Sequence, residues 1–242
     1  MSALLEVQGI TRAFGATRAV DNVSFAVQPG ELLGLIGPNG AGKSTLFNLI
    51  AGVMPPSSGK IVVDGTDVAG WKSYAMARAG VARTFQIPKP YRQLSVIENV
   101  MISAFLRELS VAGARDLADL TLNDLGLAPY RDRPASELTV GLLKRLEVAR
   151  ALAMRPKLVL FDEIMAGLTP TEVGAMTEIV AGLPARGITV IWVEHVLYAI
   201  MKTATRMVVI NRGSVIAQGT PAEVARDPLV VKAYLGEEMQ LA

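Results

Sequence analysis

Short apolar runs alternate along the chain with amphipathic stretches, in which hydrophobic and polar residues are mixed. Apolar runs of strand length, bounded by glycine, proline or charged residues, predict strands at 4–8, 19–27, 31–36, 61–64, 81–85, 158–161, 189–193, 207–210 and 214–217. A helix is predicted at 45–51, and helical periodicity replaces the strand pattern from about 95 to 153. This order predicts an α/β fold with a mostly parallel sheet and an antiparallel piece at the N-terminus.

Three helix starts are marked by capping residues, in which a hydroxyl side chain is followed three positions later by glutamate. They are Ser95 with Glu98, Thr169 with Glu172, and Thr220 with Glu223. The second and third also place proline at the first helical position, which favours helix initiation. We interpret the chain as a single domain, 1–242, in which about 1–85 and 156–242 form the core with a small β part and 86–155 form a helical insertion.

Composition narrows the class of protein. No apolar segment reaches the roughly 20 residues that a transmembrane helix needs, and the N-terminus has no secretory-signal pattern. The absence of cysteine excludes disulfides and thiolate metal sites. A net charge of +2, from 24 basic and 22 acidic residues, gives no reason to expect a nucleic-acid partner. These features are typical of a globular protein of a reducing compartment.

The segment GPNGAGKST at 37–45 carries the strongest chemical signal. It contains the phosphate-binding pattern G-x-x-x-x-G-K-S between a predicted strand and a predicted helix, which is the context that a P-loop needs. Glycines allow close backbone approach, and the N–H groups at the helix start attract phosphate. Lys43 is expected to contact the terminal phosphates, and the Ser44 hydroxyl to ligate Mg²⁺. The predicted nucleotide-binding residues are Gly37, Pro38, Asn39, Gly40, Ala41, Gly42, Lys43, Ser44 and Thr45.

Acidic residues and one histidine follow two later strands. Asp162 and Glu163 end the apolar run at 158–161, where a parallel sheet would bring them beside the P-loop. One acid suits Mg²⁺, and the next can accept a proton from an attacking water. A solvated strand end is the alternative for this acidic pair. His195, the only histidine, follows the predicted strand at 189–193 and can point at the same site, although a structural or surface role is the default for a lone histidine.

These residues together resemble the ATPase subunit of ATP-binding cassette (ABC) transporters, and the resemblance extends along essentially the whole chain. It is closest to the larger ATPase subunit of high-affinity branched-chain amino acid importers. The segments that carry it are GVARTFQ at 80–86, SVIENV at 95–100, KRLEVARALA at 144–153 and VKAYLGEE at 231–238. The resemblance implies a RecA-like P-loop NTPase core with a small antiparallel β subdomain and a helical subdomain, and it implies ATP and Mg²⁺ as ligands.

The resemblance also implies roles for single residues. Phe14 matches the aromatic that stacks on adenine, and Gln86 matches the glutamine that senses Mg²⁺ and the membrane partner. The alternatives are a turn aromatic packed on the core for Phe14 and a solvated loop residue for Gln86. Asp162 matches the metal-associated acid, Glu163 the general base and His195 the histidine at the γ-phosphate. The predicted set is therefore catalytic Lys43, Glu163 and His195, with Ser44, Gln86 and Asp162 around Mg²⁺.

The sequence departs from the family pattern in three places. The signature that serves the opposite subunit's ATP, usually Leu-Ser-Gly-Gly-Gln, reads LTVGL at 138–142, so its predicted contacts are Thr139, Val140 and Gly141. Leu142 removes an amide, and the loss of such a contact typically costs about 0.5–1.5 kcal/mol. Ile164 replaces the usual proline. Thr169 stands where Asn or Asp is usual, and its two possible roles, as a helix cap and in signalling to the other subunit, stay open.

The resemblance implies an ATP-hydrolysing subunit that dimerises head to tail around two ATP–Mg²⁺ and drives a membrane permease. The degenerate signature favours a heterodimer with a second ABC ATPase subunit. Permease subunits are expected to contact residues 89–94, an external solute-binding protein to act indirectly, and the chain to lie peripherally on the cytoplasmic face of the inner membrane. The alternatives are a non-transport ABC ATPase, which would need fused cassettes or a coiled-coil insertion, and a catalytically weak regulatory subunit. The solute itself would be selected by the permease and the binding protein.

Overall fold

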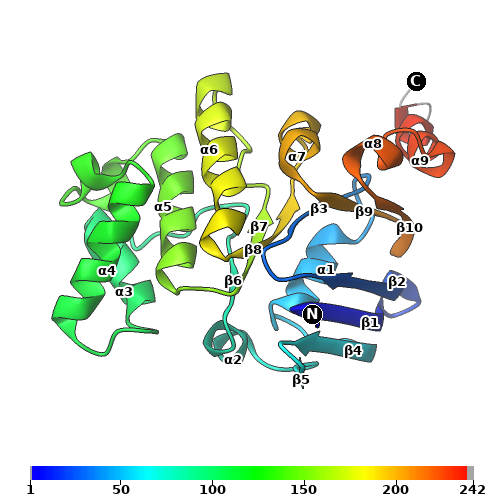
Figure 1. Ribbon diagram of the computed structural model, residues 1–242, viewed down its shortest axis with the longest axis horizontal. Coiled ribbons are helices and arrows are strands. Elements are labelled where there is room, and N and C mark those ends of the chain that lie inside the picture. The colour runs from blue at the N-terminus through cyan, green and yellow to red at the C-terminus, as the bar shows by residue number, and fades with distance from the viewer. Residues whose placement is uncertain (1, 239–242) are drawn as a thin grey trace.

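The centre of the protein is a mostly parallel sheet, seen in a computed structural model that describes residues 2–238 (Figure 1). Its strands are β3 Leu32–Ile36, β6 Val81–Arg83, β7 Leu158–Asp162, β8 Thr189–Val193, β9 Arg206–Asn211 and β10 Ser214–Gly219. The strand order is β10-β9-β3-β8-β7-β6, and β10 pairs antiparallel with β9 while the other neighbours are parallel. The predicted mostly parallel α/β sheet is confirmed.

Strands β3, β7 and β8 are buried along their whole length, because elements cover both faces of the sheet. This explains why their sequences are continuous apolar runs, which is typical of parallel sheets. Successive side chains point to opposite faces. Phe161 and Trp192 therefore belong to the hydrophobic cluster on one face, and Leu160 and Ile191 belong to the cluster on the other.

A smaller antiparallel sheet carries the N-terminal part of the chain. It consists of β1 Leu5–Phe14, β2 Thr17–Val27, β4 Ser58–Val63 and β5 Thr66–Asp67, in the order β2-β1-β4-β5. The strand predicted at 4–8 is too short, because β1 continues to Phe14 through register shifts that interrupt the simple alternation of side chains. Phe14 is thus the last strand residue, and the hairpin turn is formed by Gly15 and Ala16.

The chain between β6 and β7 is helical, as expected. It contains α3 Val96–Ala104, α4 Val111–Asp124 and α5 Val140–Ala153, which pack against one another at the end of the molecule away from the β1 hairpin (Figure 1). Their apolar sides form a continuous hydrophobic cluster with the sheet face that carries Phe161 and Trp192. The positions of the helices agree with a helical subdomain, whose boundaries at 86 and 155 stay a proposal.

The other helices are α1 Lys43–Ile50, α2 Ser73–Arg78, α6 Pro170–Gly182, α7 Leu197–Thr203, α8 Pro221–Val224 and α9 Pro228–Glu238. All three predicted capping boxes are present, at the starts of α3, α6 and α8. Sequence analysis missed α2 and β5, because six and two residues are too few to show a period. Within residues 2–238, no helix combines the length and apolar character needed to span a bilayer.

Candidate nucleotide-binding and catalytic site

The P-loop, 37–45, runs from the carboxyl end of β3 into the first turn of α1. Two of its glycines have no room for a side chain. A Cβ atom at Gly37 would lie 2.0 Å from the carbonyl oxygen of Ile210, and one at Gly42 would lie 2.3 Å from that of Ala19. Gly42 also has a φ of 104°, which L-residues with side chains rarely adopt. The backbone at Ile210 and at Ala19 therefore packs so closely against the loop that only glycine fits at these two positions.

Lys43 is held inside the loop. Its side chain is buried, and Nζ donates hydrogen bonds to the carbonyl oxygens of Gly37 at 2.5 Å and Pro38 at 2.9 Å. A pocket of about 210 Å³ opens over this loop, lined by Ala19, by every residue from 39 to 45 and by Glu163. The P-loop and the predicted general base thus face one space, as the sequence indicated.

The Glu163 carboxylate lies between two side chains from neighbouring strand ends. Oε2 accepts a hydrogen bond from Nε2 of Gln86 at 2.5 Å, and Oε1 lies 2.9 Å from Nε2 of His195. The three residues follow β6, β7 and β8, whose carboxyl ends meet at the same edge of the sheet, where α/β proteins bind ligands. The side chain of Glu163 is mostly buried, while that of His195 is about half exposed.

Glu163 has an unusual backbone conformation. Its φ of 49° is in the left-handed region, which is uncommon for a residue with a side chain. The N–H group donates to the carbonyl oxygen of Val193 at 2.9 Å, and the carbonyl oxygen accepts from Nζ of Lys144 at 3.0 Å. Such conformations persist where the surroundings hold them, and they occur often at active sites. Here the backbone bend aims the carboxylate at the pocket above the P-loop.

Asp162 is buried and paired with a cation that sequence analysis missed. Its Oδ2 atom accepts from Nη2 of Arg83 at 2.7 Å, and Nη1 of Arg83 donates to Oδ1 of Asn48 at 2.5 Å. The main-chain N–H of Asp162 donates to the hydroxyl of Thr84 at 3.3 Å. The pairing of β6 with β7 could have indicated this contact, because Arg83 ends β6 directly beside β7.

The oxygen donors of this site fit Mg²⁺. The hydroxyl of Ser44 and the carboxylate of Asp162 are hard ligands, and the amide oxygen of Gln86 is a third oxygen of this kind. The described part of the chain holds no cluster of three or more His, Cys, Asp or Glu side chains suited to a metal. Mg²⁺ is commonly held by one or two carboxylates together with substrate phosphates, so this sparse donor set suits a cation that binds with a nucleotide.

Two further charged residues lie close to Gln86, Glu163 and His195. Lys144 of α5 is 3% exposed and donates to the main-chain oxygens of Gln86 and Glu163. Burial lowers the pKa of Lys144, and nearby Glu194 and Glu163 oppose this effect. Glu194 is also buried and accepts from the N–H of Met165 at 2.8 Å, and burial raises its pKa to about 6.

Phe14 and the signature residues lie outside this cluster. Phe14 is 48% exposed, and its ring centroid lies 4.9 Å from the Arg12 guanidinium, so the side chain is open to solvent and its stacking on adenine stays a prediction. Thr139 caps α5 by accepting from the N–H of Leu142 at 3.4 Å, and Val140 is exposed. Thr169 caps α6, which confirms its structural role.

Two departures from the family pattern, Leu142 and Ile164, have local packing reasons. Gly141, which keeps the family residue, lies against the Glu172 side chain: a Cβ atom there would lie 2.0 Å from Oε1 of Glu172, so that side chain would have to move. Leu142 packs against the main hydrophobic cluster, and Ile164 is fully buried in it. Apolar side chains at these two positions therefore stabilise this chain's own core.

Comparison with known proteins defines the class. The family model described as ABC transporter matches residues 20–166, which is more than half of the chain. A second model, described as branched-chain amino acid ATP-binding cassette transporter, matches residues 214–239. The chain belongs to the ATP-binding cassette ATPases of ABC transporters.

Individual relatives match from end to end. The high-affinity branched-chain amino acid transport ATP-binding proteins BraF of Pseudomonas aeruginosa and LivG of Escherichia coli are each 36% identical, over 97% of this chain and 98% of the relative. The lipopolysaccharide export system ATP-binding protein LptB of Escherichia coli is 35% identical, over 99% of this chain and 100% of that protein.

Solved structures of an ATP-binding cassette from an ABC transporter have the same fold. The nucleotide-free form and the ADP conformation each match with a TM-score of 0.87 and 31% identity. The alignments cover 96% and 98% of this chain and 99% and 100% of the other chain. The predicted fold class is confirmed, and the protein is an ATPase that uses ATP with Mg²⁺.

Proposed function

We propose that this chain hydrolyses ATP to energise an importer of branched-chain amino acids or related small solutes. The observation that carries the proposal is the Glu163 carboxylate, held between Gln86 and His195 and facing the P-loop pocket. The family match at residues 214–239 and the similarity to BraF and LivG support this class of solute.

In the proposed reaction, water attacks the γ-phosphate in line and Glu163 orients or deprotonates that water. Lys43 and His195 stabilise the charge that develops on the phosphate oxygens. Ser44 and Asp162 would hold Mg²⁺, which would supply neutralisation of charge on the phosphates. Gln86 contacts the Glu163 carboxylate. It would signal to the membrane partner whether the metal ion and the nucleotide are bound.

The proposed partner in ATP binding is a second ABC ATPase subunit in a head-to-tail heterodimer. Val140 is exposed at the start of α5, whereas Leu142 is partly buried against this chain's own core and offers nothing polar to a facing nucleotide. A copy of this chain would therefore present a weak half-site, and a paralogue with a complete signature would present a better one. The complex would lie on the cytoplasmic face of the inner membrane, with a solute-binding protein acting indirectly.

The proposed permease contact is the segment at 89–94, directly after Gln86. Its backbone is anchored to the helical part of the chain: the N–H of Tyr91 donates to Oδ1 of buried Asn99 at 2.8 Å, and the carbonyl oxygen of Lys89 accepts from Arg150 at 2.9 Å. The side chains of Tyr91 and nearby Ile87 are nevertheless 48% and 73% exposed. An anchored backbone with exposed apolar side chains suits a protein interface.

Cysteine crosslinking tests this contact. A single cysteine at Lys89, in a chain that has none of its own, is expected to crosslink to the permease. A cysteine at Lys157, exposed before β7 at the opposite edge of the sheet, is the matched control and is expected to give no permease product. Crosslinking from the control position alone would place the permease elsewhere.

Import is favoured over export by the C-terminal match, although an export protein is nearly as similar over the whole chain.

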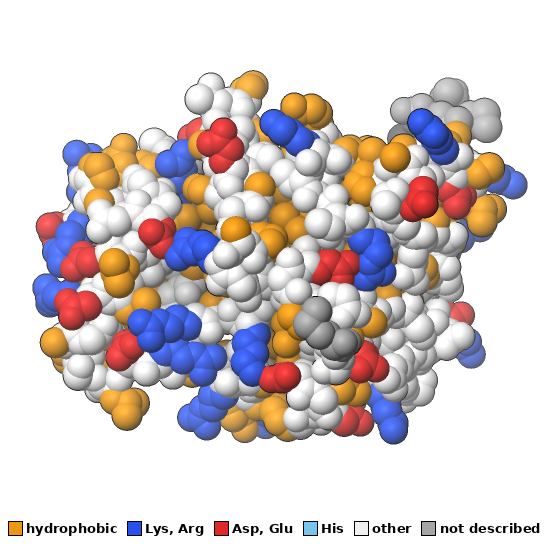
Figure 2. All heavy atoms as spheres, in the orientation of Figure 1, with side chains coloured by type: hydrophobic (Ala, Val, Ile, Leu, Met, Phe, Trp, Pro, Cys, Tyr) orange, Lys and Arg blue, Asp and Glu red, His pale blue; other side chains and the backbone are white. Residues whose placement is uncertain are grey.

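Figure 2 shows acidic and basic side chains interspersed over the face that carries α5, α6 and α7, with hydrophobic side chains gathered around the inner ends of α6 and α7. Hydrophobic surface beside mixed charge suits contacts with protein subunits.

Transport in proteoliposomes tests the function. The chain would be reconstituted with its permease, the second ATPase subunit and the solute-binding protein, and uptake of leucine, isoleucine and valine would be compared with uptake of urea and an aromatic amino acid. ATP-dependent uptake of the branched-chain amino acids is expected, with loss of uptake in Glu163→Gln. ATP hydrolysis without uptake of any of these solutes would contradict the proposal.

A further inference from the structure

Lys144 joins the two residues whose side chains meet at the centre of the site. It lies on α5, and its buried Nζ atom donates to the main-chain oxygen of Gln86 and, at 3.0 Å, to that of Glu163. Nε2 of Gln86 in turn donates to Oε2 of Glu163 at 2.5 Å. One ammonium group therefore holds the backbone from which both of these side chains project.

Burial of a lysine in this way is costly unless the charge is compensated. The two carbonyl oxygens accept hydrogen bonds from Nζ, and the buried carboxylate of Glu194 is the charge that most opposes the lowering of the Lys144 pKa by burial. A lysine needed only to cover a helix face would extend into water. Its position here is explained by the groups that it holds.

The contact with Glu163 acts on a backbone that is strained. With a φ of 49°, Glu163 depends on its surroundings to keep this conformation. Its N–H group is fixed by Val193 and its carbonyl oxygen by Lys144. These two bonds set the planes of the peptide groups on either side of Glu163 and hence the direction of the carboxylate.

We propose that Lys144 is a positioning residue for ATP hydrolysis: it sets the relative positions of the Gln86 and Glu163 side chains. The proposal rests on the proposed role of Glu163 as general base. Because Lys144 is on the helix that begins after Thr139, it links the signature end of α5 to this chain's own base through one rigid element. A movement of α5 when its signature end contacts the nucleotide of the partner subunit would thus be transmitted through Lys144 to both Glu163 and Gln86.

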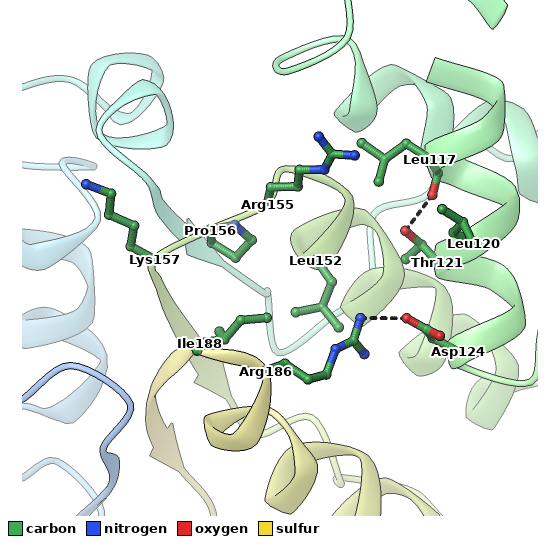
Figure 3. A pocket seen from close by; sticks show the side chains of 11 residues that line it. Leu117, Leu120, Thr121, Asp124, Leu152, Arg155, Pro156, Lys157, Arg186 and Ile188 are labelled. Carbon is green, nitrogen blue, oxygen red and sulfur yellow. Dashed lines mark hydrogen bonds and ion pairs between the residues drawn. The ribbon is translucent and has the colours of Figure 1, made fainter. Parts of the chain in front are cut away.

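A second contact between the helical part and the core supplies a matched control. Figure 3 shows Arg186, before β8, paired with Asp124 of α4 beside a pocket of about 500 Å³. The pair is 2.6 Å apart and about half exposed, and it lies at the edge of the sheet opposite to the P-loop. Exposed ion pairs contribute little, so its loss tests the effect of removing an arbitrary contact between these parts.

The experiment uses the assembled transporter, with the catalytic carboxylate of the second ATPase subunit changed to an amide so that turnover comes from this chain. Lys144→Met is expected to lower kcat at least about tenfold and to leave KM within about threefold, because small displacements of a catalytic group cost rate rather than binding. Arg186→Met is expected to keep kcat within about twofold. A kcat for Lys144→Met within twofold of wild type would overturn the proposal.

Two further variants separate positioning from folding. Lys144→Met with Glu194→Gln removes the carboxylate that the first change leaves uncompensated, so Tm is expected to recover while kcat stays low. Recovery of kcat in parallel with Tm would show a merely structural role and overturn the proposal. Lys144→Arg keeps a cationic donor, is expected to retain more turnover than Lys144→Met, and supplies the test if the methionine variants do not fold. Turnover of Lys144→Arg no higher than that of a variant without a hydrogen-bond donor at this position would count against the proposal.

Glu163→Gln distinguishes the two levels of inference. If Glu163→Gln keeps turnover, the general-base role fails, whatever Lys144 does. If Glu163→Gln loses turnover while Lys144→Met keeps it, the positioning role alone fails.

Discussion

Nε2 of His195 lies 2.9 Å from Oε1 of Glu163, although 32 residues separate them in the sequence. The parallel pairing of β7 with β8 produces this contact, because it places Asp162 beside Val193 and so brings the residues after both strands together. The histidine and the glutamate therefore form one unit at the edge of the sheet. A change at either residue is expected to alter the position of the other.

Arg83→Met is expected to destabilise the fold strongly. The ion pair between Arg83 and Asp162 is almost fully buried, and removal of one partner of such a pair typically costs about 3–5 kcal/mol, because a charge is left unpaired. The free energy of unfolding in urea measures this. Arg18→Met is the control, since its exposed pair with Asp21 should contribute less than about 1 kcal/mol. Equal losses in the two variants would contradict this account of Asp162.

Glu194 is expected to make stability depend on pH. Burial raises the pKa of Glu194 to about 6 from an ordinary value of 4.5, so the folded state binds the proton more tightly than the unfolded state. The free energy of unfolding should therefore fall as pH rises through this window. Relative to Glu194→Gln, wild type should lose about 1 kcal/mol between pH 5 and pH 7. Urea unfolding of both proteins at both pH values checks this, and a gain in relative stability would reverse the sign and reject it.

Phe14→Ala is expected to weaken ATP binding by roughly 1–2 kcal/mol if the exposed ring stacks on adenine, while Phe14→Tyr and Phe14→Trp should bind normally. GTP should also be accepted, because stacking recognises a π-face. Nucleotide titration of the folded variants measures the effect. The exposure of Phe14 means that its loss should leave Tm almost unchanged. Equal affinity in wild type and Phe14→Ala would remove the stacking role.

Much of this site was predictable from sequence, because its chemistry follows local patterns. The P-loop and Glu163 come directly after apolar strands, Asp162 ends one and His195 lies two residues after another, and parallel strands align their carboxyl ends. Strand β8 was predicted with its observed ends at Thr189 and Val193. The roles given to these residues stay proposals.

The contacts that support the site were not predictable in this way. Arg83 and Asp162 are 79 residues apart, and Lys144 and Glu163 are 19 apart on different kinds of element. A cation within a helix or at a strand end has the same sequence pattern whether it meets water or a buried carboxylate. Only the three-dimensional packing of β6, β7 and α5 decides between these cases. The full length of β1 and the presence of α2 were missed for the simpler reason that bulges and short elements lack a period.

Isolated Glu163→Gln protein is expected to be monomeric or only weakly dimeric with ATP. Leu142 is an apolar side chain partly buried against the core and cannot replace the signature amide, so a second copy should complete the nucleotide site poorly. Gel filtration with ATP and Mg²⁺ measures this, and addition of the paralogous ATPase subunit should shift the protein to a dimer. A tight ATP-dependent homodimer would contradict the heterodimer while leaving the transport function standing.

The most direct test of the central claim is the turnover of Glu163→Gln in the assembled transporter, with the partner ATPase subunit silenced as above. The pocket places Glu163 over the P-loop, so its loss should lower kcat by at least about 10²-fold, as is typical for a positioned general base. ATP binding should persist, whereas Lys43→Ala should weaken binding itself. Near-normal turnover of Glu163→Gln would contradict the assignment of Glu163 as the base.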